Sequence, residues 1–588
     1  MDVTRVFDLL PYQLEKFPQP DMVASKVNGT WKSLSTEYVA ATANAISLGL
    51  IHLGIEKGDR IGIVSMNRPE WNFVDYGIQQ VGAVSVPVYP SITVEDFKYI
   101  FTDAGVKIIF VATRELYDKI KLATADLDIQ QIYTFDEIEG IPNWTDLRKI
   151  GEKENIHRLT PYKNSVEPDD LLTLIYTSGT TGNPKGVMLT HNNLVSNFKA
   201  ATPFMPVDNR HRALSFLPLC HVYERMLSYI YVYNGVSIYY AESIETISEN
   251  LKEVHPHIFV TVPRLLEKVY DKIYAKGAEL TGIKKALFFW ALNLGLNYKQ
   301  HTNQGWWYNF QLKLANKLIF SKWREALGGN IRAIVSGGAA LQPRLATVFM
   351  AAQVTILEGY GLTETSPVIA FNHAAPEENM IGTAGPILPG VEVKIAEDGE
   401  ILSRGPHIMK GYFNRPDLTA EAIDSEGWFH TGDIGTIVNG TFLKITDRKK
   451  EIFKTSGGKY ITPQMMENKF KESVVIEQVM VCGDGEKFPS ALVVPNFQAL
   501  KEYCEHKSIP YSSDAEMIKH PQVIEKFERE IEHYNKSFAN YEQVKQFKLL
   551  PKLWSIESGE LTPTLKLKRK MIKENNLSLI NSMYEHNL

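Results

Sequence analysis

The chain has 588 residues, of which 44% are hydrophobic and 22% are charged. This is the composition of an ordinary soluble globular protein, and the length predicts several domains rather than one. The net charge of −5 argues against a general nucleic-acid-binding protein, which would carry a basic face. The N-terminus lacks the features of a signal peptide, and no apolar stretch approaches the ~20 residues that a membrane helix needs.

The three cysteines, Cys220, Cys482 and Cys504, are far apart in the sequence and form no CxxC pair. We therefore expect neither a disulfide framework nor a structural zinc site. A reducing cytoplasm is the compartment that this cysteine usage favours.

Buried strands and helices alternate in the first third of the chain. Residues 35–54 predict a helix because the segment starts with Ser, has helical apolar spacing and ends with Gly. Further helices are predicted at 71–84 and 93–105, and strands at 59–65, 85–90, 107–113 and 171–177. Such alternation predicts βαβ units and a largely parallel sheet that helices cover.

The character of the sequence changes twice further along the chain. Residues from about 264 to 325 are helical, aromatic and basic, whereas residues from about 385 to 446 form short apolar runs separated by many glycines. We expect an α/β protein with an N-terminal domain over 1–446, which contains this helical insertion and a small β-rich subdomain. A smaller α+β C-terminal domain is expected over 447–588, after a hinge at 447–450.

The segment YTSGTTGNPKG, from Tyr176 to Gly186, has the composition of a phosphate-binding loop. Glycines free the backbone to turn its N–H groups inward, hydroxyl groups add donors and a lysine adds charge. The residues concerned are Thr177, Ser178, Gly179, Thr180, Thr181, Gly182 and Lys185. The Walker pattern is absent, because Gly186 follows Lys185 where that pattern has Ser or Thr. On these residues alone, a solvent-exposed hairpin remains the alternative.

This segment resembles the phosphate loop of the acyl-adenylate-forming superfamily, which includes acyl-CoA synthetases, adenylation domains and luciferases. Three further segments resemble the family in the same order: GYGLTET (359–365), GWFHTGD (427–433) and DRKKEIFKTSGGKYITPQMME (447–467). The resemblance covers essentially the whole chain. The segments LPLCHVYER, SGGAAL and GELTPTLKLKRK are similar to those of long-chain fatty acid–CoA ligases.

The resemblance implies a two-step reaction with ATP. A fatty acid carboxylate attacks the α-phosphate and expels pyrophosphate, and the acyl-adenylate then passes to CoA. ATP and CoA are the implied co-substrates, and Mg²⁺ is the implied metal. Because phosphoryl transfer depends mainly on positioning and electrostatic stabilisation, the chain has to supply charge and alignment.

The family motifs assign roles to residues of the N-terminal domain. Glu364 and Thr177 are implied to hold Mg²⁺, which takes oxygen ligands, and Thr363 is implied to contact the α-phosphate. Without the resemblance, Glu364 is interpreted as a carboxylate at a helix N-terminus that interacts with the helix dipole. The adenine is assigned to Gly338, Ala339, Tyr360 and Gly361.

Two charged residues are implied to bind the ribose. Asp433 would accept hydrogen bonds from the ribose hydroxyls, and Arg448 would be a second contact. Their alternatives are a turn aspartate after Gly432 and a solvated member of a charge run.

The C-terminal domain is implied to bring the remaining groups. Lys566 aligns with the family lysine that approaches the carboxylate, but Lys568 and Lys570 are rivals, because Leu565 stands where many relatives have Gly. A basic helix face is the alternative. Lys450 matches the hinge position, and the pantetheine path is assigned to Gly457, Gly458 and Lys459.

Two features leave alternatives open. His221 and Arg225 are implied to lie near the substrate carboxylate, but a buried histidine with a backbone partner fits equally well. The insertion either packs as helices on the main domain or meets the inner face of a membrane. In the second case aromatic residues would lie at lipid level and lysines at headgroup level: Phe288, Phe289, Trp290, Trp306 and Trp307, with Lys284, Lys285 and Lys299.

The favoured function is a cytoplasmic, ATP-dependent long-chain fatty acid–CoA ligase. One rival is an acyl-AMP ligase that loads a carrier protein, and another is a non-catalytic fatty acid binder or uptake accessory. Fatty acid and CoA are the expected partners, and no nucleic acid is expected. The oligomeric state and the preferred chain length stay open.

Overall fold

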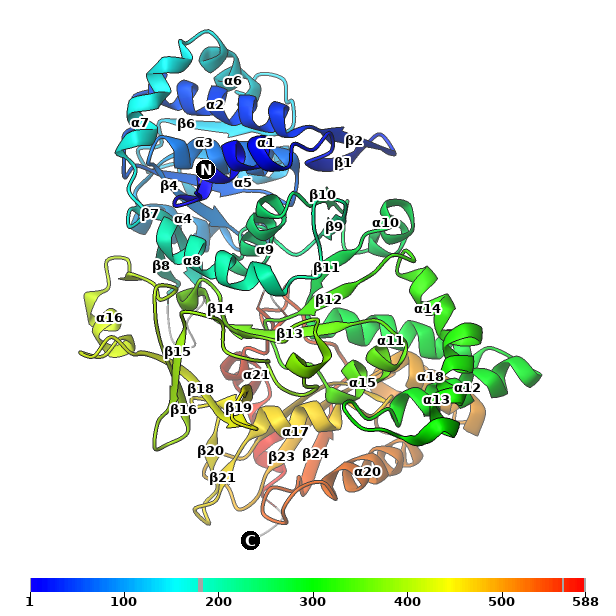
Figure 1. Ribbon diagram of the computed structural model, residues 1–588. Helices are drawn as coiled ribbons and strands as arrows, with labels where there is room; N and C mark the ends of the chain where they lie inside the picture. The colour runs from blue at the N-terminus through cyan, green and yellow to red at the C-terminus, as the bar shows by residue number, and fades with distance from the viewer. Residues whose placement is uncertain (1, 178–182, 563–564, 586–588) are drawn as a thin grey trace. The chain divides into compact units, whose positions relative to one another are not determined.

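The computed structural model describes residues 2–177, 183–562 and 565–585 (Figure 1). The chain forms two compact units. Unit 1 comprises Met1–Lys394, Leu402–His430 and Asn439–Leu443, and unit 2 comprises Ile395–Ile401, Thr431–Val438 and Lys444–Leu588. Both combine strands with helices, so the α/β fold class predicted from the sequence is confirmed.

A seven-stranded sheet in unit 1 has the strand order β17-β8-β7-β4-β3-β5-β6. Strands β7, β4, β3, β5 and β6 are parallel, whereas β8 runs antiparallel to both β7 and β17. The strands are β3 (Arg60–Val64), β4 (Val84–Val88), β5 (Val106–Val111), β6 (Gln131–Thr134), β7 (Leu171–Thr177), β8 (Lys185–Thr190) and β17 (Gly411–Tyr412). Parallel pairing requires crossover connections, and the helices between the strands supply them, including the two predicted at 71–84 and 93–105.

The crossover helices are α3 (Pro69–Gln80), α4 (Val94–Ala104), α5 (Arg114–Ala123), α6 (Trp144–Glu152) and α7 (Leu159–Ser165), and α2 (Thr36–His52) precedes β3. Their ends follow from the capping residues. Ser35 accepts the Tyr38 N–H at the start of α2, and Thr93 forms a capping box with Asp96 at the start of α4. Gly105 ends α4 with a φ of 60°, a conformation that favours glycine.

An eight-stranded sheet in unit 1 has the order β14-β13-β12-β11-β9-β10-β1-β2 and is parallel except at its two edges. Its strands are β1 (Val23–Val27), β2 (Thr30–Leu34), β9 (Arg212–Ser215), β10 (Ser237–Tyr240), β11 (Ile258–Thr261), β12 (Ala333–Ser336), β13 (Ile356–Gly361) and β14 (Val368–Phe371). Other helices of unit 1 are α1 (Leu9–Lys16), α8 (His191–Ala201), α9 (Val222–Tyr233), α10 (Ile247–Val254), α15 (Pro343–Ala351) and α16 (Pro416–Ala422).

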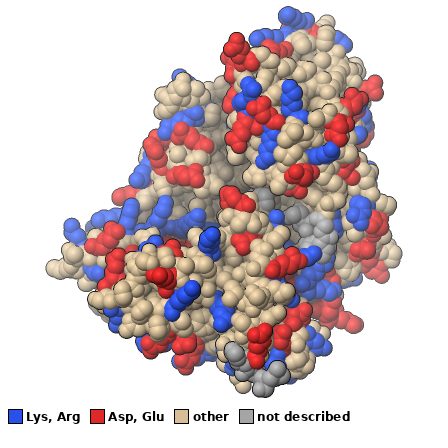
Figure 2. Space-filling model, turned by 180° about the vertical axis from the view of Figure 1, so that it is seen from behind, with Lys and Arg blue, Asp and Glu red and all other residues tan. Residues whose placement is uncertain are grey.

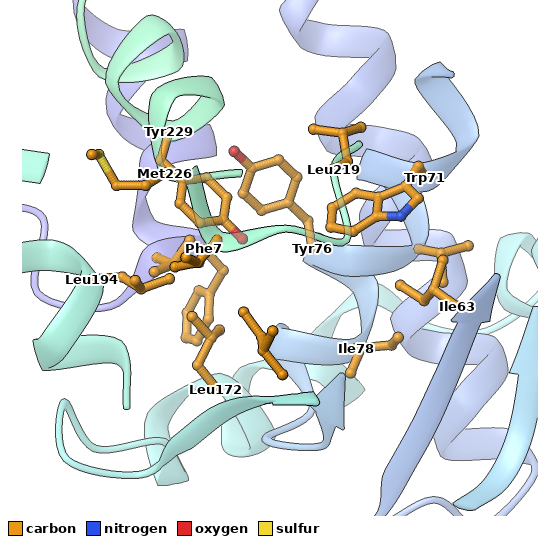
Figure 3. Packing of buried hydrophobic residues seen from close by; sticks show 14 of the residues in the cluster. Phe7, Ile63, Trp71, Tyr76, Ile78, Leu172, Leu194, Leu219, Met226 and Tyr229 are labelled. Carbon is orange, nitrogen blue, oxygen red and sulfur yellow. The ribbon is translucent and has the colours of Figure 1, made fainter. Parts of the chain in front are cut away.

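A continuous hydrophobic core joins the elements of the two sheets. Figure 3 shows Tyr76 of α3 facing Met226 and Tyr229 of α9, with Leu172 of β7 nearby and Trp71 of α3 beside Leu219. The Tyr76 and Tyr229 rings lie 6.3 Å apart between centroids. Because these buried side chains come from several elements, the core fixes α9 against the seven-stranded sheet.

The segment predicted as helical forms α11 (Pro263–Ala278), α12 (Gly282–Leu296), α13 (Gly305–Ala315) and α14 (Ser321–Ala326), with a π-helical turn at Asn316–Phe320. Phe288 is buried, and Phe289 and Trp290 are half-buried against the same core, so of the two alternatives the packed one is correct for Phe288. Trp306 and Trp307 are exposed, as a surface role requires. Of the helices that the structure describes, none is long and apolar enough to cross a bilayer.

Unit 2 contains a three-stranded sheet, β22-β23-β24, and a short hairpin, β20-β21. Its elements are β20 (Phe453–Lys454), β21 (Tyr460–Ile461), β22 (Ile476–Cys482), β23 (Ser490–Pro495), β24 (Gln546–Leu549), α17 (Pro463–Phe470), α18 (Phe497–Lys507), α19 (Asp514–Met517), α20 (Pro521–Asn535), α21 (Arg569–Asn575) and α22 (Leu577–Ser582). A four-stranded sheet has the order β15-β16-β18-β19, and the chain passes from one unit to the other within each of its strands. These strands are β15 (Glu392–Ile395), β16 (Glu400–Arg404), β18 (Phe429–Val438) and β19 (Phe442–Arg448).

Charged side chains are dispersed over the surface. On the face shown in Figure 2, Lys and Arg side chains are interspersed with Asp and Glu side chains. This distribution agrees with the small net charge of the chain.

Candidate active site

The glycine- and hydroxyl-rich segment connects β7 to β8. Thr177 is the last residue of β7 and pairs with Lys185, the first residue of β8, so the two ends of the loop lie side by side. Residues Ser178, Gly179, Thr180, Thr181 and Gly182 lie outside the described residues.

Glu364 lies in a short 3-10 helix, Thr363–Thr365, which follows β13. Its carboxylate Oε1 accepts a 2.8 Å hydrogen bond from the Tyr412 hydroxyl, and its carbonyl oxygen accepts the Met409 N–H at 2.9 Å. Burial and the nearby Glu364 raise the pKa of Tyr412, which keeps the hydroxyl protonated and able to donate. Thr363 is buried beside Glu364.

Tyr412 also lies next to Lys185. Strand β17 pairs Tyr412 with Val187 of β8, and the Phe413 N–H donates to the Gly186 carbonyl at 2.8 Å. The Lys185 Nζ lies 5.1 Å from the centre of the Tyr412 ring, within the range of a cation–π contact. The structure therefore brings together a lysine, a carboxylate and a tyrosine that are far apart in the sequence.

Backbone constraints shape the segment assigned to the adenine. A Cβ atom on Gly361 would lie 1.6 Å from the Pro367 carbonyl oxygen, so only glycine fits this close approach. Tyr360 is half-buried in β13, directly before Gly361. Gly338, with a φ of 80°, and Ala339 are exposed in the loop after β12.

Two further residues of this region were not predicted from the sequence. Glu358, two residues before Tyr360, accepts the Gly382 N–H at 3.5 Å, and burial raises the pKa of its carboxyl to about 8. Tyr412 is the other residue. An acidic residue within an apolar strand was a visible signal for Glu358, but no sequence pattern linked Tyr412 to Glu364.

His221 and Arg225 have structural partners. His221 is the N-cap of α9, where its Nδ1 accepts the Tyr223 N–H at 3.2 Å. Arg225 is completely buried and ion-paired with Asp75 at 2.5 Å, and it also donates to Tyr229 and Thr173. This buried network holds α9 against α3 and β7, so the expectation that Arg225 approaches the substrate carboxylate finds no support.

The two residues assigned to the ribose lie together in unit 2. Arg448 Nε is 3.4 Å from Asp433 Oδ1, and the Asp433 carboxylate is nearly buried, whereas the Arg448 side chain is about one-third exposed. The Asp433 N–H donates to the Thr431 hydroxyl at 3.1 Å. The preceding Gly432 has a φ of 70°, which gives the chain the turn that positions Asp433.

Lys566 lies in a tight turn near the C-terminus. The Thr562 N–H donates to its carbonyl oxygen at 2.9 Å, and its own N–H donates to the Thr562 hydroxyl at 3.0 Å. Leu565 has a φ of 60°, a conformation that glycine adopts without strain. Leu565 therefore adopts a backbone conformation that glycine would favour.

The rival lysines have other environments. Lys568 is exposed at the start of α21, and Lys570 lies 4.0 Å from Glu574 on the exposed face of that helix. Between them, Arg569 donates to Glu451 at 2.9 Å and to Glu467 at 2.6 Å. Of the three lysines, only Lys566 is half-buried within a structured turn.

The remaining predicted residues lie near the start of unit 2. Gly457, Gly458 and Lys459 form the exposed tip of the β20–β21 hairpin, where Gly458 has a φ of 77°. Lys450 is exposed in a turn directly after β19. The neighbouring Lys449 pairs with Asp398 and Glu400 at 2.6 and 2.7 Å.

Two family models match the chain. The model of the AMP-binding enzymes matches residues 12–413, and that of the AMP-binding enzyme C-terminal domain matches residues 450–588. The chain therefore belongs to the family of AMP-binding enzymes.

Several named relatives match nearly the whole chain. The chain is 34% identical to the long-chain-fatty-acid–CoA ligase FadD15 of Mycobacterium bovis, over 96% of this chain and 95% of the relative. It is 30% identical to the peroxisomal long chain acyl-CoA synthetase 7 of Arabidopsis thaliana, over 99% and 87%.

Solved structures share the fold. The adenylation domain of a carboxylate reductase from Mycobacterium chelonae matches with a TM-score of 0.74 and 21% identity, over 99% of this chain and 91% of that one. The anthranilate CoA ligase AuaEII in complex with anthranoyl-AMP matches with a TM-score of 0.73 and 18% identity, over 98% of each chain.

Proposed function

We propose that the protein is an ATP-dependent long-chain fatty acid–CoA ligase. The observation that carries the proposal is the grouping of Lys185, Glu364 and Tyr412 beside the β7–β8 loop in a member of the AMP-binding enzyme family. The similarity to named long-chain ligases over almost the full chain supports the choice of substrate and of CoA.

In the first half-reaction a fatty acid carboxylate attacks the α-phosphate of ATP, and pyrophosphate leaves. The Lys185 ammonium would neutralise charge on the leaving phosphates, and the N–H and hydroxyl groups of the loop would add donors. Thr363 would contact the α-phosphate. Such fixed charges and donors lower the barrier because they are aligned before the reaction starts.

A magnesium ion fits the residues present. Mg²⁺ usually keeps several waters and takes one or two protein carboxylates together with substrate phosphates. Glu364 offers a half-buried carboxylate, and Thr177 offers a hydroxyl at the end of β7. When bound, the ion would supply positive charge to the triphosphate, and Glu364 and Thr177 would hold it.

In the second half-reaction the CoA thiol attacks the acyl-adenylate, and AMP leaves. The chain needs no catalytic cysteine, because CoA brings its own sulfur. We assign the ribose to Asp433 and Arg448, the carboxylate contact to Lys566, and the pantetheine path to Gly457, Gly458 and Lys459.

Release of AMP and pyrophosphate from ATP, measured with a ladder of fatty acids, tests the function. We expect turnover that depends on CoA and peaks at long chains. Acyl-adenylate that forms but never passes to CoA would favour the carrier-loading rival. If no acid supports ATP cleavage, the ligase proposal fails and a fatty acid binder remains.

We also propose that α13 contacts a membrane surface peripherally. The outward face of α13 and of the following turn is apolar: Trp306 is 78% exposed, and Trp307, Phe310, Leu314 and Leu318 are exposed as well. A surface helix normally turns its polar face outward, so an exposed aromatic face indicates a contact with an apolar phase.

The charges around α13 are of one sign. Between Glu279 and Glu325 the chain has no Asp or Glu, and its charged residues are Lys284, Lys285, Lys299, Lys313, Lys317, Lys322 and Arg324. Helices that combine exposed aromatic residues with lysines bind anionic lipid surfaces.

Sedimentation with vesicles tests the contact. The protein should bind vesicles of phosphatidylcholine and phosphatidylglycerol more strongly than phosphatidylcholine alone, and Lys313→Glu with Lys317→Glu should weaken binding at least about fivefold per lysine. The control is Leu122→Ser, which changes a 68% exposed leucine of α5. Equal binding of all variants would contradict the proposal.

A further inference from the structure

We propose that Tyr412 is a positioning residue that holds the phosphate-binding lysine and the metal-binding carboxylate at a set separation. Its ring lies under Lys185 Nζ and its hydroxyl donates to Glu364, so one side chain contacts both groups. This inference rests on the proposed function, because it assumes that Lys185 and Glu364 bind the nucleotide and its metal.

The backbone around Tyr412 is tied to both partners independently of its side chain. The Phe413 N–H and the Lys410 N–H donate to carbonyl groups of β8, at 2.8 and 3.0 Å. The Met409 N–H donates to the Glu364 carbonyl at 2.9 Å. A short segment thus bridges the strand that carries Lys185 and the 3-10 helix that carries Glu364.

The neighbourhood of this segment is itself anchored. Asn193 of α8 donates from its side chain to the carbonyls of Pro406 and Ile408, at 2.8 and 2.9 Å. The Tyr412 N–H donates to the Thr419 hydroxyl at 2.9 Å. Tyr412 is only 8% exposed, so its ring has little freedom to leave Lys185 or Glu364.

The hydrogen bond from the Tyr412 hydroxyl leaves the Glu364 carboxylate able to bind a second partner. A carboxylate has about four acceptor sites, and the hydroxyl occupies one of them on Oε1. The hydrogen bond already restrains rotation of the Glu364 side chain. Less rotational freedom is therefore lost when a metal binds. We therefore expect Tyr412 to favour binding of magnesium-bound ATP rather than binding of the fatty acid.

Tyr412→Phe removes the hydroxyl and keeps the ring over Lys185. We expect the affinity for magnesium-bound ATP, measured by calorimetry without fatty acid or CoA, to fall roughly 2- to 12-fold, the range for the cost of immobilising one side chain. The KM for the fatty acid should not change. In a Glu364→Gln background the same substitution should have a much smaller effect, because its partner is already altered.

Tyr239→Phe is a closely matched control. Tyr239 is also 8% exposed and also donates to a carboxylate at 2.8 Å, that of Asp21. The Tyr239→Phe variant should lose about as much thermal stability as the Tyr412→Phe variant does, but it should keep full nucleotide affinity.

The outcomes separate the two proposals. If the wild-type protein forms the acyl-adenylate while Tyr412→Phe binds magnesium-bound ATP as Tyr239→Phe does, the role of Tyr412 is overturned and the ligase function stands. An equal loss of affinity from Tyr412→Phe in the wild-type background and in the Glu364→Gln background also overturns the role. If the wild-type protein binds no magnesium-bound ATP, both proposals fail.

Discussion

At the scale of single residues, the turn before Lys566 decides how the C-terminal lysine is presented. Leu565 adopts a left-handed backbone conformation in which an L-residue is strained by roughly 1–2 kcal/mol. Its side chain is 40% exposed and so contributes little burial in return. The lysine that follows is held by two hydrogen bonds to Thr562.

Leu565→Gly should therefore be close to neutral for stability. The relief of strain offsets the greater freedom of glycine in the unfolded chain, about 0.4–1 kcal/mol. Leu579→Gly is the control, because Leu579 is 38% exposed but lies inside α22, where glycine costs about 1 kcal/mol. Urea denaturation of both variants is the measurement, and a loss well above 1 kcal/mol for Leu565→Gly would contradict the assigned turn.

At the scale of elements, a buried ion pair joins α3 and α9. The Asp75 carboxylate also accepts the Tyr229 hydroxyl at 2.7 Å, and the Arg225 guanidinium also donates to Ser85 of β4 at 2.8 Å. Removing one partner of such a pair leaves the other as an uncompensated buried charge. Together with Thr173 of β7, the network therefore makes the packing of four elements interdependent.

Arg225→Met should lower the free energy of unfolding by about 3–5 kcal/mol. The double variant with Arg225→Met and Asp75→Asn should lose less free energy of unfolding than the two single variants lose in sum, because both substitutions remove the same interaction. Arg114→Met is the control: Arg114 pairs with Asp118 at the surface, so the loss should stay below about 1 kcal/mol. Additive losses for the buried pair would refute the coupling.

A second element-scale feature lies where β19 ends. Burial, together with the charges of Glu451 and Glu467, raises the pKa of Asp447 to about 7, against the opposing effect of Arg569. Its carboxylate accepts the Arg448 N–H at 2.6 Å and the Gln464 N–H at 3.3 Å. The Asp447 carboxylate thus links the end of β19 to the start of α17, and protonation of Asp447 changes the charge at this link.

The stability of unit 2 should depend on pH through Asp447. Between about pH 4 and 7 the folded protein keeps the Asp447 proton that the unfolded chain has lost, so stability falls as the pH rises through this window. The loss should total roughly 4 kcal/mol, and Asp447→Asn should abolish that part of the slope. Denaturant unfolding at several pH values is the measurement, and parallel profiles for both proteins would exclude the effect.

At the scale of the whole molecule, we propose that Lys450 is the hinge about which the chain that follows it changes its pose between the two half-reactions. Hinge residues absorb changes in φ and ψ. The side chain of Lys450 is exposed, so the side chain itself is not required for packing.

Lys450→Pro should separate the two half-reactions, because proline fixes φ near −65°. We expect acyl-adenylate formation to fall less than tenfold and transfer to CoA to fall by far more, both measured under single-turnover conditions. Lys450→Ala keeps the backbone free and should behave as the wild-type protein does. Equal losses in both steps for Lys450→Pro would argue against a hinge at this position.

Local patterns in the sequence were enough to predict elements such as α4 and β7 and to identify the family. Helix α4 was predictable because Thr93, Asp96 and Gly105 act through hydrogen bonds and backbone preferences within a few residues. Strand β7 was predictable from one continuous apolar run. The order of four motifs identified the family, since each motif is a short segment whose residues act together.

Only the tertiary structure decided the environments of individual side chains. It placed Tyr412 between Lys185 and Glu364, and it turned Phe288 inward while Trp306 stayed exposed. It also paired Arg225 with Asp75 in a buried ion pair. The physical reason is common to all three cases: these environments depend on contacts between residues far apart in the chain, which no local spacing encodes.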